Sequence, residues 1–478
     1  MPFIASETED DVRDFAARVL TDLEGKKGLA VIAMPAPFAP LSTFLRAVPR
    51  AFSIMWDAQT LGGTSMATSG VVRQISLTGP ERFHQLKNAL PHLWKDMKVI
   101  DHPDCAGKLP PLRVFGGVSF VPGSGGAAPW TEFADGRFIL PRWCFGRTRA
   151  EVGFLRLVID TERDCTITGR HDLLTQLDEI VEALEAYEGQ TTSVTTLTIP
   201  RIEPTALKQT SCEEWTRYIE RIQGEIRARR FHKVVAARRA DVTLSGEVDD
   251  IEVLSRLATE PQCTRFAFRG PHSSFIGASP ETLVRKRGVD LTTQALAGTL
   301  RSLGSEMPVL SQRTTQLLRS QKDQSEHEFV VQDIIRSLKP YVTECDVPEH
   351  PTVSKIRNIL HLNTPIAAKM RHDANVLDVV DTLHPTPAVG GLPKREAASW
   401  IAQHERSPRG WYTGTVGWVD IAGDATFVVA IRCGLLTPTH AYVFTGAGIV
   451  ADSDAAAEYG ETELKQLPML RALGMVIN

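Results

Sequence analysis

The order of apolar and polar positions predicts strands and helices that do not alternate regularly along the chain. Apolar residues recur at helical spacing between 215 and 226, which predicts a helix with one face on a core. Ser211 and Glu214 have the spacing of a capping box at its start. Further helices are predicted over 325–338 and 453–466. Apolar runs predict strands over 233–238, 265–268, 274–276, 282–285, 292–296, 413–420, 425–433 and 441–445. This order is typical of an α+β fold with mostly antiparallel sheet.

The N-terminal half also carries strand signals. Residues 107–141 are rich in Gly and Pro with apolar runs between them, a pattern that indicates strands joined by turns. A stretch with two prolines and no periodicity, 195–210, indicates a connector. We therefore predict an N-terminal half, 1–200, that contributes strands to a shared core, and a C-terminal region, 205–478. The two are expected to form one folded unit.

Composition narrows the class of protein. The chain has 478 residues, of which 42% are hydrophobic and 23% charged, and this excludes a disordered tail, a collagen and a coiled coil. With 53 basic and 57 acidic residues the formal charge is −4, which argues against a nucleic-acid binder. A small anionic ligand stays compatible, because it needs only a few local cations.

Location is predicted from the uncharged runs, the N-terminus and the cysteines. Three long uncharged runs, 28–45, 114–131 and 433–451, are broken by Pro, Gly or polar residues, so no membrane span is predicted. The acidic start of the chain is unlike a signal peptide. The seven cysteines are scattered without a Cys-x-x-Cys pair, which favours reduced thiols and makes a zinc site improbable. A cytoplasmic location is expected.

The last predicted helix carries the strongest chemical signal. Glu458, Glu461 and Lys465 lie on one helical face. Two carboxylates one turn apart suit a hard cation such as Mg²⁺, and the lysine suits an anion. A solvated face with an intrahelical Glu–Lys pair explains the same spacing, and the spacing alone favours that interpretation.

Three further positions each allow two interpretations. Gly446, Ala447 and Gly448 end a strand, where backbone N–H groups can bind a carboxylate or the chain can simply turn. Arg432, inside the apolar strand 425–433, needs a carboxylate partner if it is buried, or else faces solvent. Lys233 shares a strand face with apolar residues, so it either reaches solvent from the strand end or lines a cleft. The residues alone indicate an α+β protein with a candidate carboxylate–Mg²⁺ site.

Taken in order, these segments resemble the chorismate-utilising enzymes, which include isochorismate synthases, salicylate synthases and the large subunits of anthranilate and aminodeoxychorismate synthases. The resemblance covers about half the chain. The segments are KVVAAR at 233–238, GASPETL at 277–283, ALAGT at 295–299, SEHE at 325–328, HPTPAVGG at 384–391 and TGAGIVADSD…EYGETELK from 445 to 465. The family resemblance implies large, mostly antiparallel sheets packed as a sandwich with helices outside.

Within this family the resemblance favours isochorismate synthase. KVVAAR contains the lysine of the water-adding enzymes, and HPTPAVGG is most similar to the isochorismate synthase loop. A leucine-leucine-glutamate-serine inhibitor motif is absent from the sequence. The presence of an N-terminal half favours the menaquinone branch over the siderophore branch. Departures at Thr282, Leu300 and Thr415 concern pocket shape only.

The resemblance also implies roles for individual residues in the conversion of chorismate to isochorismate. Lys233 would be the general base, neutral when it acts, and Glu281 the protonated general acid. Mg²⁺ would bind the ring carboxylate of chorismate and be held by Glu326, Glu461 and Glu458. Substrate contacts are expected from Thr299, Tyr412, Arg432, Lys465 and the backbone of Gly446, Ala447 and Gly448. His327, Glu328 and His384 are expected to be structural.

Three alternatives remain at this point. A salicylate synthase would eliminate pyruvate after forming isochorismate. An amine-transferring subunit would need ammonia or a glutamine amidotransferase partner, and the presence of Lys233 argues against it. A non-catalytic chorismate-binding protein would not need the intact acid, base and carboxylate set. For all of them chorismate is the expected small-molecule partner. Binding to nucleic acid or to a membrane is not expected, and a monomer is favoured over an oligomer.

Overall fold

The computed structural model describes residues 12–58, 63–148, 152–188, 204–246, 248–257, 262–301, 307–356 and 359–475. Five strands form the base of the fold, in the pairing order β4–β1–β7–β6–β3. Among the described strands, β1 and β4 make the one parallel pair. The base strands are β1 (Leu29–Ala36), β3 (Ser65–Leu77), β4 (Lys98–Asp101), β6 (Gly136–Arg147) and β7 (Gly153–Asp160).

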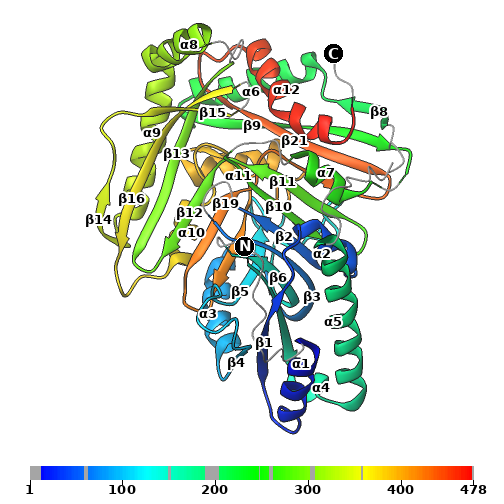
Figure 1. Cartoon of the computed structure of the whole chain (residues 1–478). Coiled ribbons are helices and arrows are strands. Elements are labelled where there is room, and N and C mark those ends of the chain that lie inside the picture. The colour runs from blue at the N-terminus through cyan, green and yellow to red at the C-terminus, as the bar shows by residue number, and fades with distance from the viewer. Residues whose placement is uncertain are drawn as a thin grey trace.

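Two arms of antiparallel sheet extend from this base (Figure 1). The first arm runs β3–β2–β10–β11–β20–β21–β9, with β8 and β17 paired to β9. Its strands are β2 (Ser53–Asp57), β8 (Pro204–Gln209), β9 (Lys233–Leu244), β10 (Thr264–Arg269), β11 (Ser274–Ser279), β17 (Gly391–Leu392), β20 (Cys433–Leu436) and β21 (His440–Ile449).

The second arm runs β6–β5–β18–β19–β12–β13–β16, with β14 and β15 paired to β16. Its strands are β5 (Arg113–Val118), β12 (Thr282–Arg287), β13 (Asp290–Arg301), β14 (Val342–Asp346), β15 (Thr352–Ile356), β16 (Ile359–Met370), β18 (Thr415–Asp420) and β19 (Ala425–Val429). The α+β prediction with mostly antiparallel sheets is therefore confirmed.

An apolar core joins the two arms. Trp56 and Phe275 from the first arm pack in one cluster with Phe115 and Trp418 from the second. Such contact between the inner faces of two sheets is the defining feature of a sandwich. Because β2 and β5 come from the N-terminal half and pair with β10 and β18, both halves contribute strands to each arm. The division proposed at 200–205 falls partly outside the described residues and stays a prediction.

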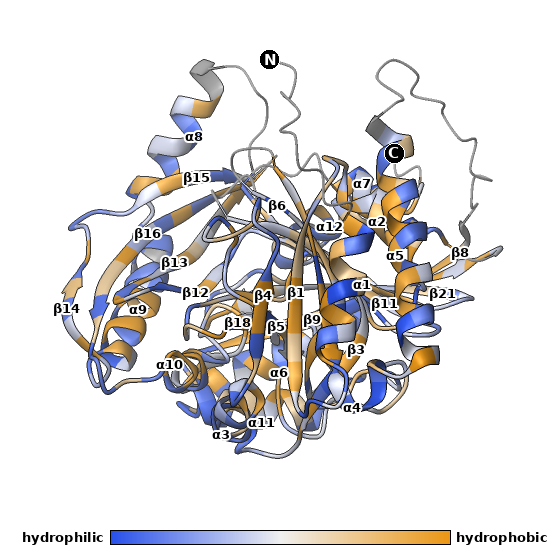
Figure 2. Cartoon of the chain, turned by 60° about the horizontal axis from the view of Figure 1, so that its bottom comes forward, coloured by the Kyte–Doolittle hydropathy of each residue, from blue (hydrophilic) through white to orange (hydrophobic). Residues whose placement is uncertain are grey.

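Helices cover the outside of the sheets and are amphipathic, with hydrophobic and hydrophilic residues on the same helix (Figure 2). The predicted capping box at Ser211 and Glu214 is present in α6. Within the described residues, none of the helices is long and apolar enough to cross a membrane. The helices are α1 (Val12–Asp22), α2 (Leu41–Ala47), α3 (Arg82–Trp94), α4 (Thr161–Asp164), α5 (Ile167–Glu188), α6 (Cys212–Arg227), α7 (Asp250–Arg256), α8 (Met307–Arg319), α9 (Gln321–Leu338), α10 (Val376–Leu383), α11 (Lys394–His404) and α12 (Ala455–Ala472).

Candidate active site

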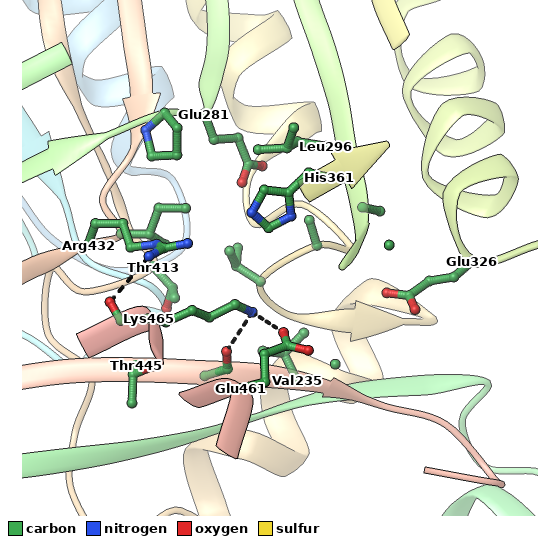
Figure 3. A pocket seen from close by; sticks show the side chains of 18 of the residues that line it. Val235, Glu281, Leu296, Glu326, His361, Thr413, Arg432, Thr445, Glu461 and Lys465 are labelled. Atoms are coloured by element: carbon green, nitrogen blue, oxygen red, sulfur yellow. Dashed lines mark hydrogen bonds and ion pairs between the residues drawn. The ribbon is translucent and has the colours of Figure 1, made fainter. Parts of the chain in front are cut away.

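A pocket of about 150 Å³ lies between the two arms (Figure 3). Strands β9 and β21 supply one wall, strands β13 and β16 supply the opposite wall, and helices α9 and α12 add charged side chains. The predicted site residues that line it are Lys233, Glu281, Glu326, Tyr412, Arg432, Gly446, Gly448, Glu458, Glu461 and Lys465. Residues up to 232 positions apart in the chain thus share one pocket, because the two arms bring their strands together.

Ala447 and Thr299 stand apart from this set. Successive residues of a strand point to opposite faces, so Ala447 points away from the pocket that Gly446 and Gly448 line. Its side chain packs in the apolar cluster of Trp215 on α6. A side-chain contact of Ala447 with a ligand in this pocket is therefore excluded, and the predicted contact through its backbone stays a prediction. Thr299 belongs to β13, but its side chain lies outside the described part of the structure, so its role stays a prediction.

Lys233 begins β9 and is buried, with only 6% of its surface exposed. Its Nζ lies 2.6 Å from Oε1 of Glu326, on α9. A Cβ at Gly448 would lie 2.6 Å from Cε of Lys233, so the absence of a side chain there makes room for the lysine. Lys233 therefore lines a cleft, and the alternative of a lysine reaching solvent is wrong.

Glu281 precedes β12 and is 5% exposed. Burial raises the pKa of this carboxyl from 4.5 to about 7, while a hydrogen bond from Thr386 and the charges of Lys233 and Lys465 oppose the rise. Thr386 Oγ1 donates to Oε1 of Glu281 over 3.4 Å. A buried carboxyl with this pKa exchanges its proton near neutral pH, as a general acid must.

The loop that carries Thr386 is fixed to the N-terminal half. His384 Nε2 lies 3.2 Å from the carbonyl oxygen of Ser119 and 3.1 Å from that of Phe120. Burial lowers the pKa of His384 to about 3, so the ring is neutral and Nε2 carries the proton that it donates. His384 therefore holds the loop in place and does not line the pocket, as expected for a structural residue.

Lys465 and Arg432 bring positive charge to the pocket. Lys465 Nζ, on α12, lies 2.5 Å from Oε1 of Glu461 and donates to the carbonyl oxygen of Gly446 over 3.1 Å. Arg432 does not lie within a strand. The predicted strand 425–433 is two strands, β19 and β20, and Arg432 between them adopts a φ of 52°, in the left-handed region. This break turns the arginine into the pocket rather than along a sheet face (Figure 3).

His361 and Asp323 line the pocket and were not predicted from the sequence. His361 lies on β16, and burial together with the charges of Arg432 and Lys465 lowers its pKa well below 6.5. It is therefore a neutral ring beside Glu281 (Figure 3). A single histidine in an alternating strand carries no spacing signal, and its position depends on the pairing of β13 with β16.

The carboxylates of the pocket suit a divalent cation that is shared with a ligand. Glu326, Glu458 and Glu461 all line it, and Glu458 accepts a hydrogen bond from Ser453 over 3.0 Å. Among the described residues, no group of three or more His, Cys, Asp and Glu is arranged to hold a metal. Mg²⁺ usually takes only one or two protein carboxylates and completes its shell with water and substrate oxygens. The donor set therefore fits Mg²⁺ without forming a complete protein cage.

Comparison with known proteins identifies the family. Residues 17–474 match the model of a family described as chorismate binding enzyme. The chain belongs to the chorismate-binding enzyme family. It is 31% identical over 395 residues to isochorismate synthase MenF of Bacillus subtilis, covering 82% of this chain and 80% of that protein. It is 39% identical over 264 residues to the salicylate biosynthesis isochorismate synthase of Pseudomonas aeruginosa, or 55% of each chain.

A solved structure of the family has the same fold. The menaquinone-specific isochorismate synthase MenF from Escherichia coli superposes with a TM-score of 0.75 at 25% sequence identity, covering 96% of this chain and 99% of that one. The chorismate-utilising resemblance and the fold it implied are thus confirmed. Membership of the chorismate-binding family also gives a reason for the two cations, because chorismate carries two carboxylates.

Proposed function

We propose that this protein is an isochorismate synthase, which adds water at C2 of chorismate and expels the C4 hydroxyl. The observation that carries the proposal is the placement of Lys233 and Glu281 in one pocket with two further cations and four further carboxylates, of Asp323, Glu326, Glu458 and Glu461. The isochorismate synthases of Bacillus subtilis and Escherichia coli are similar to this chain over most of its length, which supports the same activity.

Glu281 supplies the proton for the leaving hydroxyl in this proposal. Hydroxide is a poor leaving group, so it must be protonated as its bond to C4 breaks. The raised pKa of Glu281, about 7, keeps a large fraction of the carboxyl protonated at neutral pH. The Thr386 hydroxyl holds the group in place, and the opposing charges of Lys233 and Lys465 leave it able to lose its proton.

Lys233 takes the proton from the attacking water. The amine can accept a proton only when it is neutral and free of its carboxylate, so its pair with Glu326 has to open. Glu326, Glu458 and Glu461 would hold Mg²⁺ together with the ring carboxylate of chorismate, where the ion supplies positive charge that fixes the carboxylate and draws electrons from the ring. With Glu326 held in this way, Lys233 would be free of its carboxylate and able to accept the proton.

Arg432 and Lys465 bind the carboxylates of the substrate. A guanidinium matches a carboxylate with two parallel hydrogen bonds, which suits Arg432 to the enolpyruvyl group. Lys465, which donates to the Gly446 carbonyl and pairs with Glu461, provides a second positive charge. Tyr412 and the backbone of Gly446 and Gly448 complete the wall.

The test is incubation of the purified protein with chorismate and Mg²⁺, followed by chromatography of the products. We expect isochorismate, no pyruvate, and no turnover after chelation of the metal. Lys233→Ala should abolish turnover while chorismate still binds, and the exposed Arg227→Gln should leave turnover unchanged. Salicylate and pyruvate as the main products would replace the proposal with a salicylate synthase. Anthranilate formed with ammonia would replace it with an amine-transferring subunit.

We also infer a place in menaquinone biosynthesis, a cytoplasmic location and a monomeric state. The match to the menaquinone-specific enzyme over 99% of that chain supports the first. Size-exclusion chromatography with light scattering tests the monomer, which should give a mass near 52.6 kDa.

A further inference from the structure

A second, larger pocket of about 640 Å³ lies behind one wall of the candidate active site. Tyr412 and Phe444 line both pockets. Their rings are stacked, with centroids 5.1 Å apart and planes inclined by 16°. The other walls of the second pocket come from α6, from β8 and β9, and from the segment 404–409 that follows α11 (Figure 1). None of its charged residues belongs to the catalytic set.

The second pocket is strongly positive although the whole chain has a charge of −4. Seven cationic and three acidic side chains line it. Each acidic group has a cationic partner from the pocket itself: Glu405 pairs with Arg409 at 2.5 Å, Asp241 with Arg239 at 2.5 Å, and Glu214 with Arg406 at 2.6 Å. The remaining cations are Lys208, Arg217, Arg221 and Arg238, of which Arg217 lies 3.8 Å from Glu213, outside the pocket lining.

Arg238 is the buried member of this group, with 4% of its surface exposed. Its Nε donates to Thr462 and its Nη1 to Gln209, and its guanidinium lies 4.0 Å from the centre of the Tyr459 ring. Within the described part of the chain, Nη2 has no hydrogen-bond partner, and the nearby charge of Glu463 acts on the guanidinium without forming an ion pair or hydrogen bond with it. Leaving a buried donor of a charged group without an acceptor is costly, so an anion in the pocket that accepts from Nη2 would stabilise this arginine.

Tyr218 and the aromatic residues of the lining indicate a second property of the ligand. The Tyr218 hydroxyl is buried and also has no hydrogen-bond partner among the described residues. Its ring, with those of Trp215, Tyr412 and Phe444, forms the apolar part of the lining. Aromatic faces favour stacking with a flat ring, and an unpaired hydroxyl favours an oxygen acceptor.

We propose that this pocket binds a small organic carboxylate that carries a flat ring. The carboxylate would be held by the arginines of α6 and β9, and the ring would lie against the aromatic wall that the pocket shares with the candidate active site. The proposal does not depend on the reaction that the active site catalyses, because it rests only on the charge, the unpaired groups and the aromatic lining of the second pocket.

Calorimetric titration of the full chain with benzoate tests the proposal. Arg217 and Arg221 lie one turn apart on α6 and are exposed, so the double variant Arg217→Gln/Arg221→Gln should fold normally, as circular dichroism can verify. We expect it to bind benzoate at least about tenfold more weakly, since each lost charge-assisted hydrogen bond weakens binding by such a factor. The matched control is Arg227→Gln, an exposed arginine of the same helix outside the pocket, which should bind benzoate like the unmodified protein.

Further titrations distinguish binding in the second pocket from binding in the active site, and the contribution of the ligand's ring from that of its charge. Benzoate binding should survive in Arg432→Gln, which removes a cation of the active site. Inorganic phosphate and benzyl alcohol, which lack the ring and the charge respectively, should bind at least about tenfold more weakly than benzoate. The proposal is overturned if benzoate does not bind, if its binding depends on Arg432 and not on the α6 arginines, or if phosphate binds as tightly as benzoate.

Discussion

At the scale of single residues, the two groups proposed to transfer protons, Glu281 and Lys233, differ in their surroundings. Glu281 is buried, and its pKa of about 7 follows mainly from the loss of water around it, which outweighs the opposing charges of Lys233 and Lys465. Lys233 is equally buried but is matched with the Glu326 carboxylate at 2.6 Å. The pocket thus contains an acid, Glu281, that retains its proton, and a lysine, Lys233. The lysine must lose its partner Glu326 before it can accept a proton.

The titration of Glu281 predicts how activity depends on pH. An acid must be protonated to act, so kcat/KM should fall as the pH rises through about 7, the pKa of this group in the folded protein. Initial rates of chorismate consumption at constant ionic strength, measured across the neutral and alkaline range, test this. A rate that stays level from neutral to alkaline pH would remove Glu281 from the role of acid.

The same burial predicts a gain in stability when the carboxyl is removed. The pKa of Glu281 in the fold lies above its ordinary value of 4.5, so the folded protein binds the extra proton and loses stability as the pH rises from 4.5 to about 7. Glu281→Gln stays neutral throughout. It should lower kcat by roughly 10²–10⁴-fold and raise the free energy of unfolding above pH 7 by up to about 3 kcal/mol.

Scanning calorimetry at two pH values provides the control for this prediction. The difference in melting temperature between Glu281→Gln and the unmodified protein should be present above pH 7 and vanish well below pH 4.5, where both side chains are neutral in both states. An equal difference at both pH values would mean that packing, and not charge, causes it.

At the scale of elements, the site depends on β9 and β21 lying side by side. Gly448 pairs with Val235 in this ladder, and its missing side chain leaves the space that Lys233 occupies. Helix α12 then brings Lys465 to the carbonyl oxygen of Gly446 on the same strand. Backbone geometry, rather than a flexible loop, therefore sets the position of both lysines.

Gly448→Ala is expected to displace Lys233 while the fold persists. The new Cβ would lie 2.6 Å from Cε and 3.1 Å from Nζ of Lys233, and the end of a lysine side chain can move. Activity should fall at least about tenfold, because misplaced catalytic groups lose rate steeply, with little change in melting temperature. Gly460→Ala is the matched control on α12, where a Cβ meets nothing within 4 Å, and it should retain activity. Equal activity in both variants would contradict the placement of Lys233.

Local signals in the sequence were sufficient for some elements and not for others. The capping box of α6 was predictable, because Ser211 and Glu214 satisfy each other within one turn. The break between strands at Arg432 was not predictable. Apolar residues continue on both sides of it, and an arginine, unlike a glycine, does not indicate a positive φ in the sequence. Lys233 and Glu281 were named by the order of family motifs, whereas the position of His361 depends on the pairing of β13 with β16, which are distant in the sequence.

At the scale of the whole molecule, the two halves of the chain share both arms of the fold. β2 pairs with β10 and β5 pairs with β18, so each arm crosses between the halves. His384 adds a contact from the loop beside Glu281 to Ser119 and Phe120. The sequence indicated a shared core but not this connection, because strand order in a sheet depends on long-range packing that periodicity does not report.

This sharing predicts that the protein unfolds in one transition. Gly117, on β5, faces Trp411 and Val416, and a Cβ there would lie 2.5 Å from Cζ3 of that tryptophan. Gly117→Ala should therefore lower the free energy of unfolding by about 1–3 kcal/mol, as overpacking usually does. Gly224→Ala, on the exposed part of α6 with nothing within 4 Å of the new Cβ, should instead raise it by about 1 kcal/mol. If the halves are one unit, far-ultraviolet circular dichroism and tryptophan fluorescence will follow a single transition that Gly117→Ala shifts as a whole. Two transitions, of which Gly117→Ala moves only one, would show instead that the halves fold separately despite their shared strands.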